Sequence, residues 1–424
     1  MKLLKYPADK DKVDQILGKN TFNFQDNRTK IVEEIINDVR LNGDKAVKKY
    51  TAKFDRAELD DLRVSVEEIE EAYKLVDDKY IASLRKSIEN VTDFHRKQVR
   101  QNWFDYNKGM TGQLINSLNR IGAYVPGGRA AYPSSVVMTV IPAKVAGVEE
   151  IVVVSPPDQE GKANPYTLVA ANEAGVGEIY KLGGAQAIAA LAFGTDTIGA
   201  VDKIVGPGNI YVTLAKKLVY GIVDIDMLAG PSEVLVLADE KANPEFIAAD
   251  LLSQAEHDPL AVSTLITTDE NLAKKVIDAV KEQLKSLSRK DIAEKSITDN
   301  GTVILVEDLE TGIELVNLFA PEHFELLVNE PFKYLGKIKN AGAIFIGDYS
   351  SEPLGDYMAG PNHVLPTSGT ARFASPLNTD DFLKKSSIIY YQKEELAKVK
   401  DDVVRLAELE GLDAHARAIK VRFK

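Results

Sequence analysis

The sequence contains no cysteine. This absence excludes disulfide bonds, thiolate ligands for zinc and a cysteine nucleophile, so covalent thiohemiacetal chemistry on an aldehyde is excluded too. Long hydrophobic runs are also absent, and no segment approaches the roughly 20 apolar residues that cross a bilayer. The first ten residues lack the apolar core of a secretion signal, which predicts a cytoplasmic protein.

Positive charge is in deficit. The chain has 52 Lys and Arg against 64 Asp and Glu, a formal net charge of -12. Such a charge repels the phosphate backbone of nucleic acids and provides no gain from counterion release. Hydrophobic residues make up 45% of the chain and charged residues 27%, as in ordinary globular proteins. We therefore expect a folded protein that binds neither nucleic acid nor a membrane.

Short apolar segments alternate with helical segments along most of the chain. Helical periodicity dominates up to about Trp103, and Ser65 with Glu68 forms a capping-box signature there. The expected strands are residues 121–125, 151–155, 178–182, 203–205, 223–226, 234–238, 262–267, 301–306 and 324–328. A further helix begins at Asn243 and should end near Asp258, because Pro259 disfavours helical geometry before it. The alternation predicts parallel sheets of the α/β class.

A chain of 424 residues exceeds what a single core usually holds. We predict two Rossmann-like parallel-sheet domains, each an incomplete dinucleotide fold, with a small N-terminal arm and a C-terminal helical tail. The predicted ranges are 1–24 for the arm, 25–122 plus 240–376 for the first α/β domain, 123–239 for the second, and 377–424 for the tail. Because the tail is too small to fold alone, it should dock on the body or on a second subunit.

Glycine-rich loops follow the strands of the second predicted domain. They lie at residues 126–128, 183–186, 206–209 and 229–232. Ligands of such sheets gather at the carboxyl ends of the strands. The loop that starts at Gly206 resembles a dinucleotide-binding fingerprint, but Tyr211 replaces its third glycine. Tight turns without any ligand explain these glycines about as well.

Four of the five histidines lie in dense polar contexts. The pairs are Gln254 with His257, Glu322 with His323, Asp356 with His363, and Glu410 with His415. Carboxylate and imidazole in this combination suit metal binding and proton transfer. The fifth histidine, His95, continues an apolar helical series and is expected to be a packing residue.

Each pair also has a purely structural interpretation. Gln254 and His257 could satisfy the carbonyls of a helix C-terminus, and Glu322 with His323 could be an exposed pair at a turn. Asp356 favours turns through its side chain. His363 is most easily explained as loop structure, and His415 as a surface residue. No single motif decides between these interpretations.

Taken together, eight motifs resemble the histidinol dehydrogenase family. They are Gly-Ala-Tyr124-Val-Pro-Gly-Gly, Gly-Gly-Ala-Gln186, Gly-Pro-Gly-Asn209, Ala-Gly-Pro-Ser232, Gln254-Ala-Glu-His257, Ala-Pro-Glu322-His323, Gly-Asp356-Tyr and Asn-His363. The resemblance covers essentially the whole chain and is weakest over the first hundred residues. It implies oxidation of L-histidinol through L-histidinal to L-histidine by two molecules of NAD, in the last steps of histidine biosynthesis.

The resemblance also implies roles for particular residues and a zinc ion in each subunit. The implied zinc ligands are Gln254, His257, Asp356 and His415, and the implied NAD contacts are Tyr124, Gln186 and Asn209. The implied substrate contacts are Ser232, Gln254, His257, His323, Asp356, Glu410 and His415. Glu410 and His415 would reach the site of a neighbouring subunit, so a homodimer is expected. Because Gln is an uncommon zinc ligand, manganese or another divalent ion stays open.

The chemistry requires two proton acceptors. His323 suits removal of the hydroxyl proton during alcohol oxidation, and Glu322 suits activation of water for hydration of the aldehyde. Two alternatives remain: a zinc metallohydrolase on an α/β scaffold, and a non-catalytic protein that binds a ligand through a metal.

Overall fold

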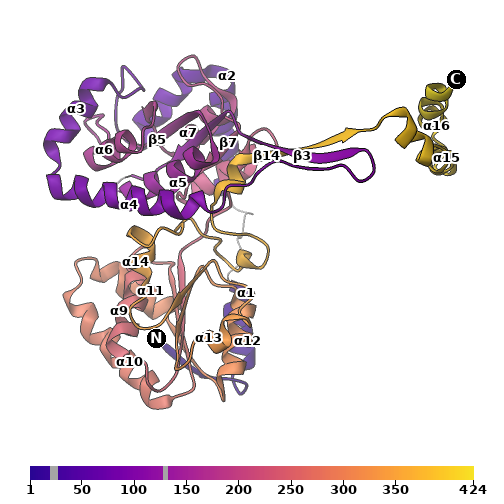
Figure 1. Cartoon of the computed structure of the whole chain (residues 1–424). Coiled ribbons are helices and arrows are strands. Elements are labelled where there is room, and N and C mark those ends of the chain that lie inside the picture. The colour runs from indigo at the N-terminus through magenta and orange to yellow at the C-terminus, as the bar shows by residue number, and fades with distance from the viewer. Residues whose placement is uncertain (20–26, 128–131) are drawn as a thin grey trace. The chain divides into compact units, whose positions relative to one another are not determined.

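The structure is a computed structural model that describes residues 1–19, 27–127 and 132–424. The chain forms two compact units. Unit 1 comprises residues 1–98 and 118–382, and unit 2 comprises residues 99–117 and 383–424. Unit 1 contains two parallel sheets with helices on their faces, whereas unit 2 contains antiparallel strands and two helices (Figure 1). The predicted α/β class with parallel sheets is confirmed.

The first sheet of unit 1 has six parallel strands in the order β1-β11-β10-β9-β12-β13. These are β1 (Lys2–Lys5), β9 (Glu233–Ala238), β10 (Val262–Thr267), β11 (Thr302–Leu305), β12 (His323–Leu327) and β13 (Ala343–Ile346). Both faces are apolar, since Val234 and Val236 of β9 join one hydrophobic cluster and Leu235 and Leu237 the other. Successive side chains of a strand point to opposite faces, so this sheet must be covered on both sides.

Helices cover both faces of the first sheet (Figure 1). One face carries α9 (Pro244–Ala255), α10 (Glu270–Gln283) and α11 (Lys290–Asn300), and the other carries α1 (Lys10–Lys19), α12 (Leu309–Phe319) and α13 (Phe332–Leu335). Three further helical segments of unit 1 are α14 (Glu352–Tyr357), η1 (Leu284–Ser286) and η2 (Thr370–Arg372), and a fourth, η3 (Thr379–Phe382), packs against the second sheet's cluster through Phe382.

The second sheet has five parallel strands in the order β6-β5-β4-β7-β8. They are β4 (Arg120–Tyr124), β5 (Glu150–Ser155), β6 (Glu178–Lys181), β7 (Lys203–Val205) and β8 (Asp224–Ile225). One face packs against α2 (Asn27–Phe54), α7 (Gly184–Phe193) and α8 (Ile210–Val219). The other packs against α3 (Val66–Leu75), α4 (Asp78–Arg96), α5 (Pro133–Ala146) and α6 (Pro165–Glu173). His95 in α4 is fully buried, which confirms the prediction of a packing residue.

Unit 2 is a three-stranded antiparallel sheet followed by two helices (Figure 1). The strands are β2 (Trp103–Asp105), β3 (Met110–Ser117) and β14 (Leu383–Tyr390), and the helices are α15 (Lys393–Leu409) and α16 (Asp413–Lys420), with η4 (Val421–Phe423) at the end. The central strand β3 pairs along its whole length with β14. Two segments that are distant in the sequence thus form one sheet.

The predicted arm contains an element of the first sheet, because Lys2–Lys5 pairs in parallel with β11 at the sheet edge. The predicted end of the arm at residue 24 and the glycine at position 128 lie outside the described residues. Unit 2 also takes in residues 99–117, in addition to most of the predicted tail. The predicted division into domains therefore stays a prediction.

Two local predictions need correction. The helix that begins after Asn243 ends at Ala255, so His257 lies beyond it, in a turn closed by a bond from the His257 N–H to the Gln254 carbonyl (3.2 Å). Asp356 lies in the short helix α14 rather than in a glycine-rich turn. The proline inside this helix is at its second position, where a missing N–H costs no hydrogen bond.

Candidate active site

The predicted catalytic residues of unit 1 lie at the amino end of the first sheet. Glu322 precedes β12, His323 is its first residue, and Ser232 precedes β9. Gln254 lies in the last turn of α9, which follows β9 and returns along the sheet. Ligands of open parallel sheets usually gather at the opposite edge. This site lies at the amino end instead, because Glu322 and His323 stand at the start of β12.

His323 is held by its Nδ1 atom. This atom lies 2.9 Å from the Nε2 of Gln254 and 3.2 Å from the main-chain oxygen of Glu233. The Gln254 amide N–H donates to Nδ1 when Nδ1 carries a lone pair, whereas a hydrogen on Nδ1 would donate to the Glu233 carbonyl and leave the lone pair on Nε2. Nε2 is buried without a hydrogen-bond partner and lies 3.8 Å from the Oδ1 of Asp356. Nε2 can accept a proton in the tautomer that carries its hydrogen on Nδ1.

Glu322 is anchored by Glu233, the residue whose carbonyl lies next to His323. Its Oε2 accepts a hydrogen bond from the Glu233 main-chain N–H (2.8 Å) and lies 3.8 Å from the Nδ1 of His323. Burial raises the pKa of Glu322 to about 8, although His323 acts in the opposite direction. A carboxylate with a raised pKa is a stronger base than an exposed one.

Asp356 brings further groups toward His323. Its Oδ1 lies 3.9 Å from the Nδ1 of His363, and its main-chain oxygen lies 3.2 Å from the same nitrogen. Burial raises the pKa of Asp356, but the nearby imidazole of His323 and the charges of His363 and His257 lower it overall. His257 also feels the carboxylate of Asp356, which opposes the lowering of its pKa by desolvation. Asp356 thus lies beside the imidazoles of His323 and His363, and its charge also acts on His257.

These groups fit a divalent cation in their chemistry. Gln254 is fully buried and its Oε1 has no hydrogen-bond partner, so an oxygen ligand is available. Asp356 adds a carboxylate and His257 an imidazole, which are donors that zinc accepts. Across residues 1–19, 27–127 and 132–424, no three His, Asp or Glu side chains form a complete metal site by themselves. The predicted set of zinc ligands therefore stays a prediction.

Two of the predicted residues belong to unit 2. Glu410 is the C-cap of α15, and His415 lies in α16. Both side chains are exposed. Glu410 and His415 thus flank the turn between α15 and α16.

Three further acids, Glu352, Glu325 and the half-buried Asp250, were not predicted from the sequence. Glu352 raises the pKa of His323, and together with Glu322 and Asp356 it outweighs burial and brings that pKa to about 10. Glu325 is buried and neither of its carboxyl oxygens has a hydrogen-bond partner by geometry; burial raises its pKa, and the carboxyl of Asp250 raises it further.

A spacing signal for these acids exists in the sequence. Glu325 is two residues after His323 on a strand, Glu352 is four before Asp356 on a helix, and Asp250 is four before Gln254 on another helix. Each spacing puts the acid on the same face as the predicted residue.

The predicted cofactor residues lie at the carboxyl end of the second sheet. Tyr124 is the last residue of β4, Gln186 is in the first turn of α7 after β6, and Asn209 caps α8 after β7. The buried hydroxyl of Tyr124 accepts a hydrogen bond from the Gly184 N–H (3.1 Å), and burial raises its pKa to about 12. Both amide atoms of Gln186 are buried without a hydrogen-bond partner.

A short connection joins the two groups of residues. The carboxyl end of β8, at Ile225, and the amino end of β9, at Glu233, are separated by residues 226–232. Seven residues span at most about 25 Å when fully extended. The chain itself therefore keeps the carboxyl edge of the second sheet within this distance of the amino edge of the first.

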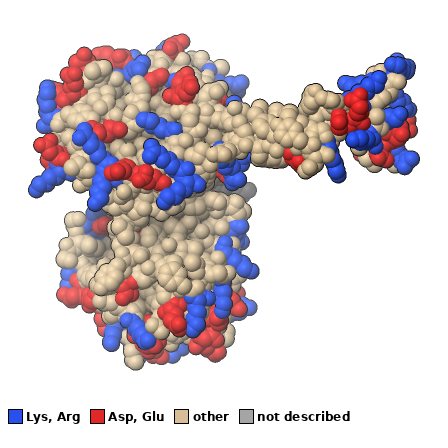
Figure 2. All heavy atoms as spheres, viewed as in Figure 1, with Lys and Arg blue, Asp and Glu red and all other residues tan. Residues whose placement is uncertain are grey.

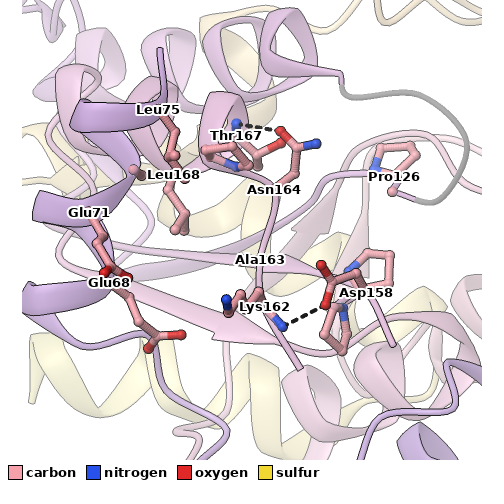
Figure 3. A pocket seen from close by; sticks show the side chains of 15 residues that line it. Glu68, Glu71, Leu75, Pro126, Asp158, Lys162, Ala163, Asn164, Thr167 and Leu168 are labelled. Carbon is pink, nitrogen blue, oxygen red and sulfur yellow. Dashed lines mark hydrogen bonds between the residues drawn. The ribbon is translucent and has the colours of Figure 1, made fainter. Parts of the chain in front are cut away.

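A separate pocket of about 330 Å³ lies at the carboxyl ends of β4 and β5 (Figure 3). Glu68, Glu71 and Asp158 line it together with Lys162, over an apolar floor that includes Leu168. None of the predicted site residues lines this pocket. Three carboxylates against one lysine do not favour a pyrophosphate group, so the pocket is not assigned to the phosphates of a dinucleotide.

Comparisons with known proteins agree with one another. A family model described as histidinol dehydrogenase matches residues 19–423. Histidinol dehydrogenase of Clostridium acetobutylicum is 57% identical over 93% of this chain and 92% of the relative, and that of Bacillus subtilis is 56% identical over 93% and 92%. A crystal structure of histidinol dehydrogenase from Elizabethkingia anophelis is 40% identical, with a TM-score of 0.95 over 100% of this chain and 98% of that chain. None of the helices in the described residues is long and apolar enough to span a membrane.

Proposed function

Because the chain belongs to the histidinol dehydrogenase family, we propose that it is an NAD-dependent oxidoreductase that converts L-histidinol through L-histidinal to L-histidine. The observation that supports this most directly is that Glu322 and His323, two adjacent proton acceptors, both contact the main chain of Glu233. We also propose that the enzyme works in the cytoplasm. The metallohydrolase alternative explains a metal but not the glycine loops of the second sheet, and the family does not favour it.

His323 is the proposed base of the alcohol oxidation. Loss of hydride from an alcohol carbon requires the hydroxyl proton to leave as well. Nε2 of His323 can take this proton if Nδ1 donates to the Glu233 carbonyl, 3.2 Å away. His323 must be neutral for this task, and a divalent cation near Asp356 would offset part of the carboxylate field that raises its pKa.

Glu322 is the proposed base of the aldehyde oxidation. An aldehyde gives up a second hydride only after hydration to a diol, so a water molecule must be deprotonated at the carbonyl carbon. Oε2 of Glu322 is occupied by the Glu233 N–H (2.8 Å), which leaves the other carboxylate oxygen for the water. Since the chain has no cysteine, this second step proceeds without a covalent thiohemiacetal.

Gln254, His257 and Asp356 are the proposed zinc ligands from one subunit, and His415 is the proposed ligand from the other. Zinc, when bound, would hold the imidazole end of the substrate and so orient its reacting carbon, a gain on the order of several kcal/mol. Manganese satisfies the same nitrogen and oxygen donors. Ser232 and Glu410 are proposed substrate contacts.

Tyr124, Gln186 and Asn209 are the proposed contacts of NAD, which accepts the hydride in each oxidation. The unpartnered amide of Gln186 supports this assignment, because a buried amide without a partner is costly. Asn209 uses its side-chain oxygen to cap α8, through bonds from the N–H groups of Tyr211 (3.0 Å) and Val212 (3.2 Å). Its amide group can therefore donate to a ligand.

A homodimer is the proposed functional unit. Unit 2 exposes large apolar side chains on its strands and on its helices, and Figure 2 shows few charged groups along the strands. These side chains are Trp103, Phe104, Tyr106, Ile389 and Tyr390 on and beside the strands, and Leu406, Leu409 and Leu412 on and beside the helices. Such a surface marks an interaction site. We propose that unit 2 packs on a second copy and places Glu410 and His415 in its active site.

The test is one assay on one sample. Purified protein is analysed for bound metal and then mixed with histidinol and NAD while NADH absorbance is recorded. We expect about one equivalent of zinc per chain and two NADH for each histidinol consumed. A metallohydrolase or a non-catalytic binding protein would give no NADH, and that outcome would refute the proposed function.

A further inference from the structure

A buried ion pair lies beside the proposed NAD loop. It joins Lys216 of α8 with Asp226, which follows β8, and their side chains are 3% and 0% exposed. The Lys216 ammonium contacts the Oδ1 of Asp226 directly. Charges buried to this extent lose most of their hydration, which is expensive unless other hydrogen bonds complete the site.

Both members of the ion pair form hydrogen bonds with the main chain of Gly206. Oδ2 of Asp226 accepts from the Gly206 N–H (2.7 Å), and the Lys216 ammonium donates to the Gly206 carbonyl (3.0 Å). Oδ1 of Asp226 also accepts from the Met227 N–H (2.6 Å). One ion pair therefore holds both polar main-chain groups of Gly206.

Gly206 is the point where the second sheet passes into the proposed NAD loop. It follows β7, begins Gly-Pro-Gly-Asn209, and has a φ of +111°. A Cβ at this position would lie 2.1 Å from the main-chain oxygen of Tyr124. Gly206 thus packs directly against the backbone of one proposed NAD contact and begins the loop that carries another.

Helix α8 also binds the loop of residues 229–232, which leads to β9 and the proposed substrate contact Ser232. Oγ1 of Thr213, three residues before Lys216 on α8, donates to the main-chain oxygen of Ala229 (3.1 Å). Ala229 begins the loop Ala-Gly-Pro-Ser232, which enters β9. Side chains three apart on a helix share a face, so one face of α8 ties down both loops.

We propose that Lys216 and Asp226 are positioning residues for NAD, and this inference rests on the proposed function. They fix the position of the Gly206 main chain. This holds the side chains of Asn209 and Tyr124 where both can contact the cofactor. Stability alone is a poor explanation for the pair, because apolar replacements of buried ion pairs are often neutral or stabilising. Neither residue touches the reacting atoms.

The test is the double variant Lys216→Met/Asp226→Asn, which removes both charges and keeps the side-chain shapes. We expect the KM for NAD to rise about tenfold, because a displaced loop misplaces its ligand contacts. The KM for histidinol, kcat at saturating NAD and the zinc content should stay within about twofold. Calorimetric titration with NAD alone should give the same weakening.

Lys203 and Asp224 provide a matched control. They form an ion pair (2.9 Å) between β7 and β8, the strands that lead to Gly206 and Asp226, but at the amino edge of the sheet. Lys203→Met/Asp224→Asn should leave the KM for NAD unchanged. If the first double variant does not fold, Asp226→Asn alone replaces it, since the amide can still accept one N–H; a smaller rise in the KM for NAD is then expected.

Two results would overturn the inference: an unchanged KM for NAD in a folded variant, or equal losses for NAD and histidinol together with a lower melting temperature. The wild-type protein separates this inference from the proposed function. If the wild type produces no NADH from histidinol, the proposed function fails. If it does and the variant binds NAD normally, only the positioning role fails.

Discussion

Glu233 connects the two proposed catalytic residues through its main chain. Its N–H donates to Glu322, and its carbonyl lies 3.2 Å from the Nδ1 of His323. The adjacent strands β9 and β12 are parallel, and His323 is opposite Val234 in their register. The two proposed bases thus share one main-chain anchor, which does not depend on the rotamer of Glu233.

We predict that Glu322→Gln separates the two oxidations. The amide cannot deprotonate water, so oxidation of histidinal should fall about a hundredfold or more, whereas oxidation of histidinol to histidinal should fall much less. Single-turnover NADH formation from each substrate measures the two steps. Equal losses in both would contradict the assignment of Glu322 to water.

His257→Asn should lower metal content and activity together, because an amide replaces an imidazole donor. We expect a loss of metal affinity of about tenfold or more. Metal analysis after dialysis, with NADH formation on the same sample, tests this, and His363→Asn is the matched control because His363 is expected to be structural. Full zinc without turnover in His257→Asn would assign His257 another role.

At the scale of elements, Arg120 joins three neighbouring strands at the amino edge of the second sheet. From β4 it bonds Glu178 of β6 (2.8 and 3.1 Å) and contacts Glu150 of β5. The bonds from Arg120 lower the pKa of Glu178, although partial burial opposes them. This group therefore contributes to stability above its unfolded pKa, and the contribution is lost as the pH falls through the lower folded value.

We expect Glu178→Gln to cost about 1 kcal/mol of unfolding free energy at pH 7, since one charge-assisted bond is lost and water screens the rest. The cost should shrink toward zero as the pH falls through the lowered pKa of Glu178. Urea unfolding at pH 7 and across the acid range measures it. Glu150→Gln, whose side chain is 61% exposed, is the control and should cost less. A cost for Glu178→Gln that does not depend on pH would contradict the ion-pair explanation.

Elements with a strong local pattern were predictable, and those without one were not. The strands of both parallel sheets consist of short apolar runs, and the capping box of Ser65 and Glu68 forms as expected. Strand β3, with the sequence Met-Thr-Gly-Gln-Leu-Ile-Asn-Ser, carries no regular alternation. Its partner β14 begins at residue 383, so the pairing depends on a contact that no local pattern encodes.

At the scale of the whole molecule, the proposed dimer makes a quantitative prediction. His323→Ala removes a function of unit 1, and His415→Ala removes a function of unit 2. If each active site combines unit 1 of one chain with unit 2 of the other, a mixed dimer has one intact site and one doubly defective site. Random reassociation of equal amounts should then restore about a quarter of the wild-type activity.

The measurement is NADH formation after the two inactive variants are mixed, dissociated and reassociated. Each variant treated alone is the control and should stay inactive. If unit 2 served the site of its own chain, no mixed dimer would contain an intact site. Absence of restored activity in verified mixed dimers would contradict the shared site.

The sequence by itself determined the α/β class, the strands of both sheets other than β1 and β13, the family and the residues proposed for chemistry, because apolar periodicity and motif spacing are local properties. Only the tertiary structure decided that Glu233 anchors both Glu322 and His323, and that the charge of Glu352 acts on both of them. The hydrogen bonds from Lys216 and Asp226 to the Gly206 main chain are likewise visible only in the tertiary structure. These contacts join residues on separate elements, and burial and hydrogen-bond geometry exist only once the elements have packed.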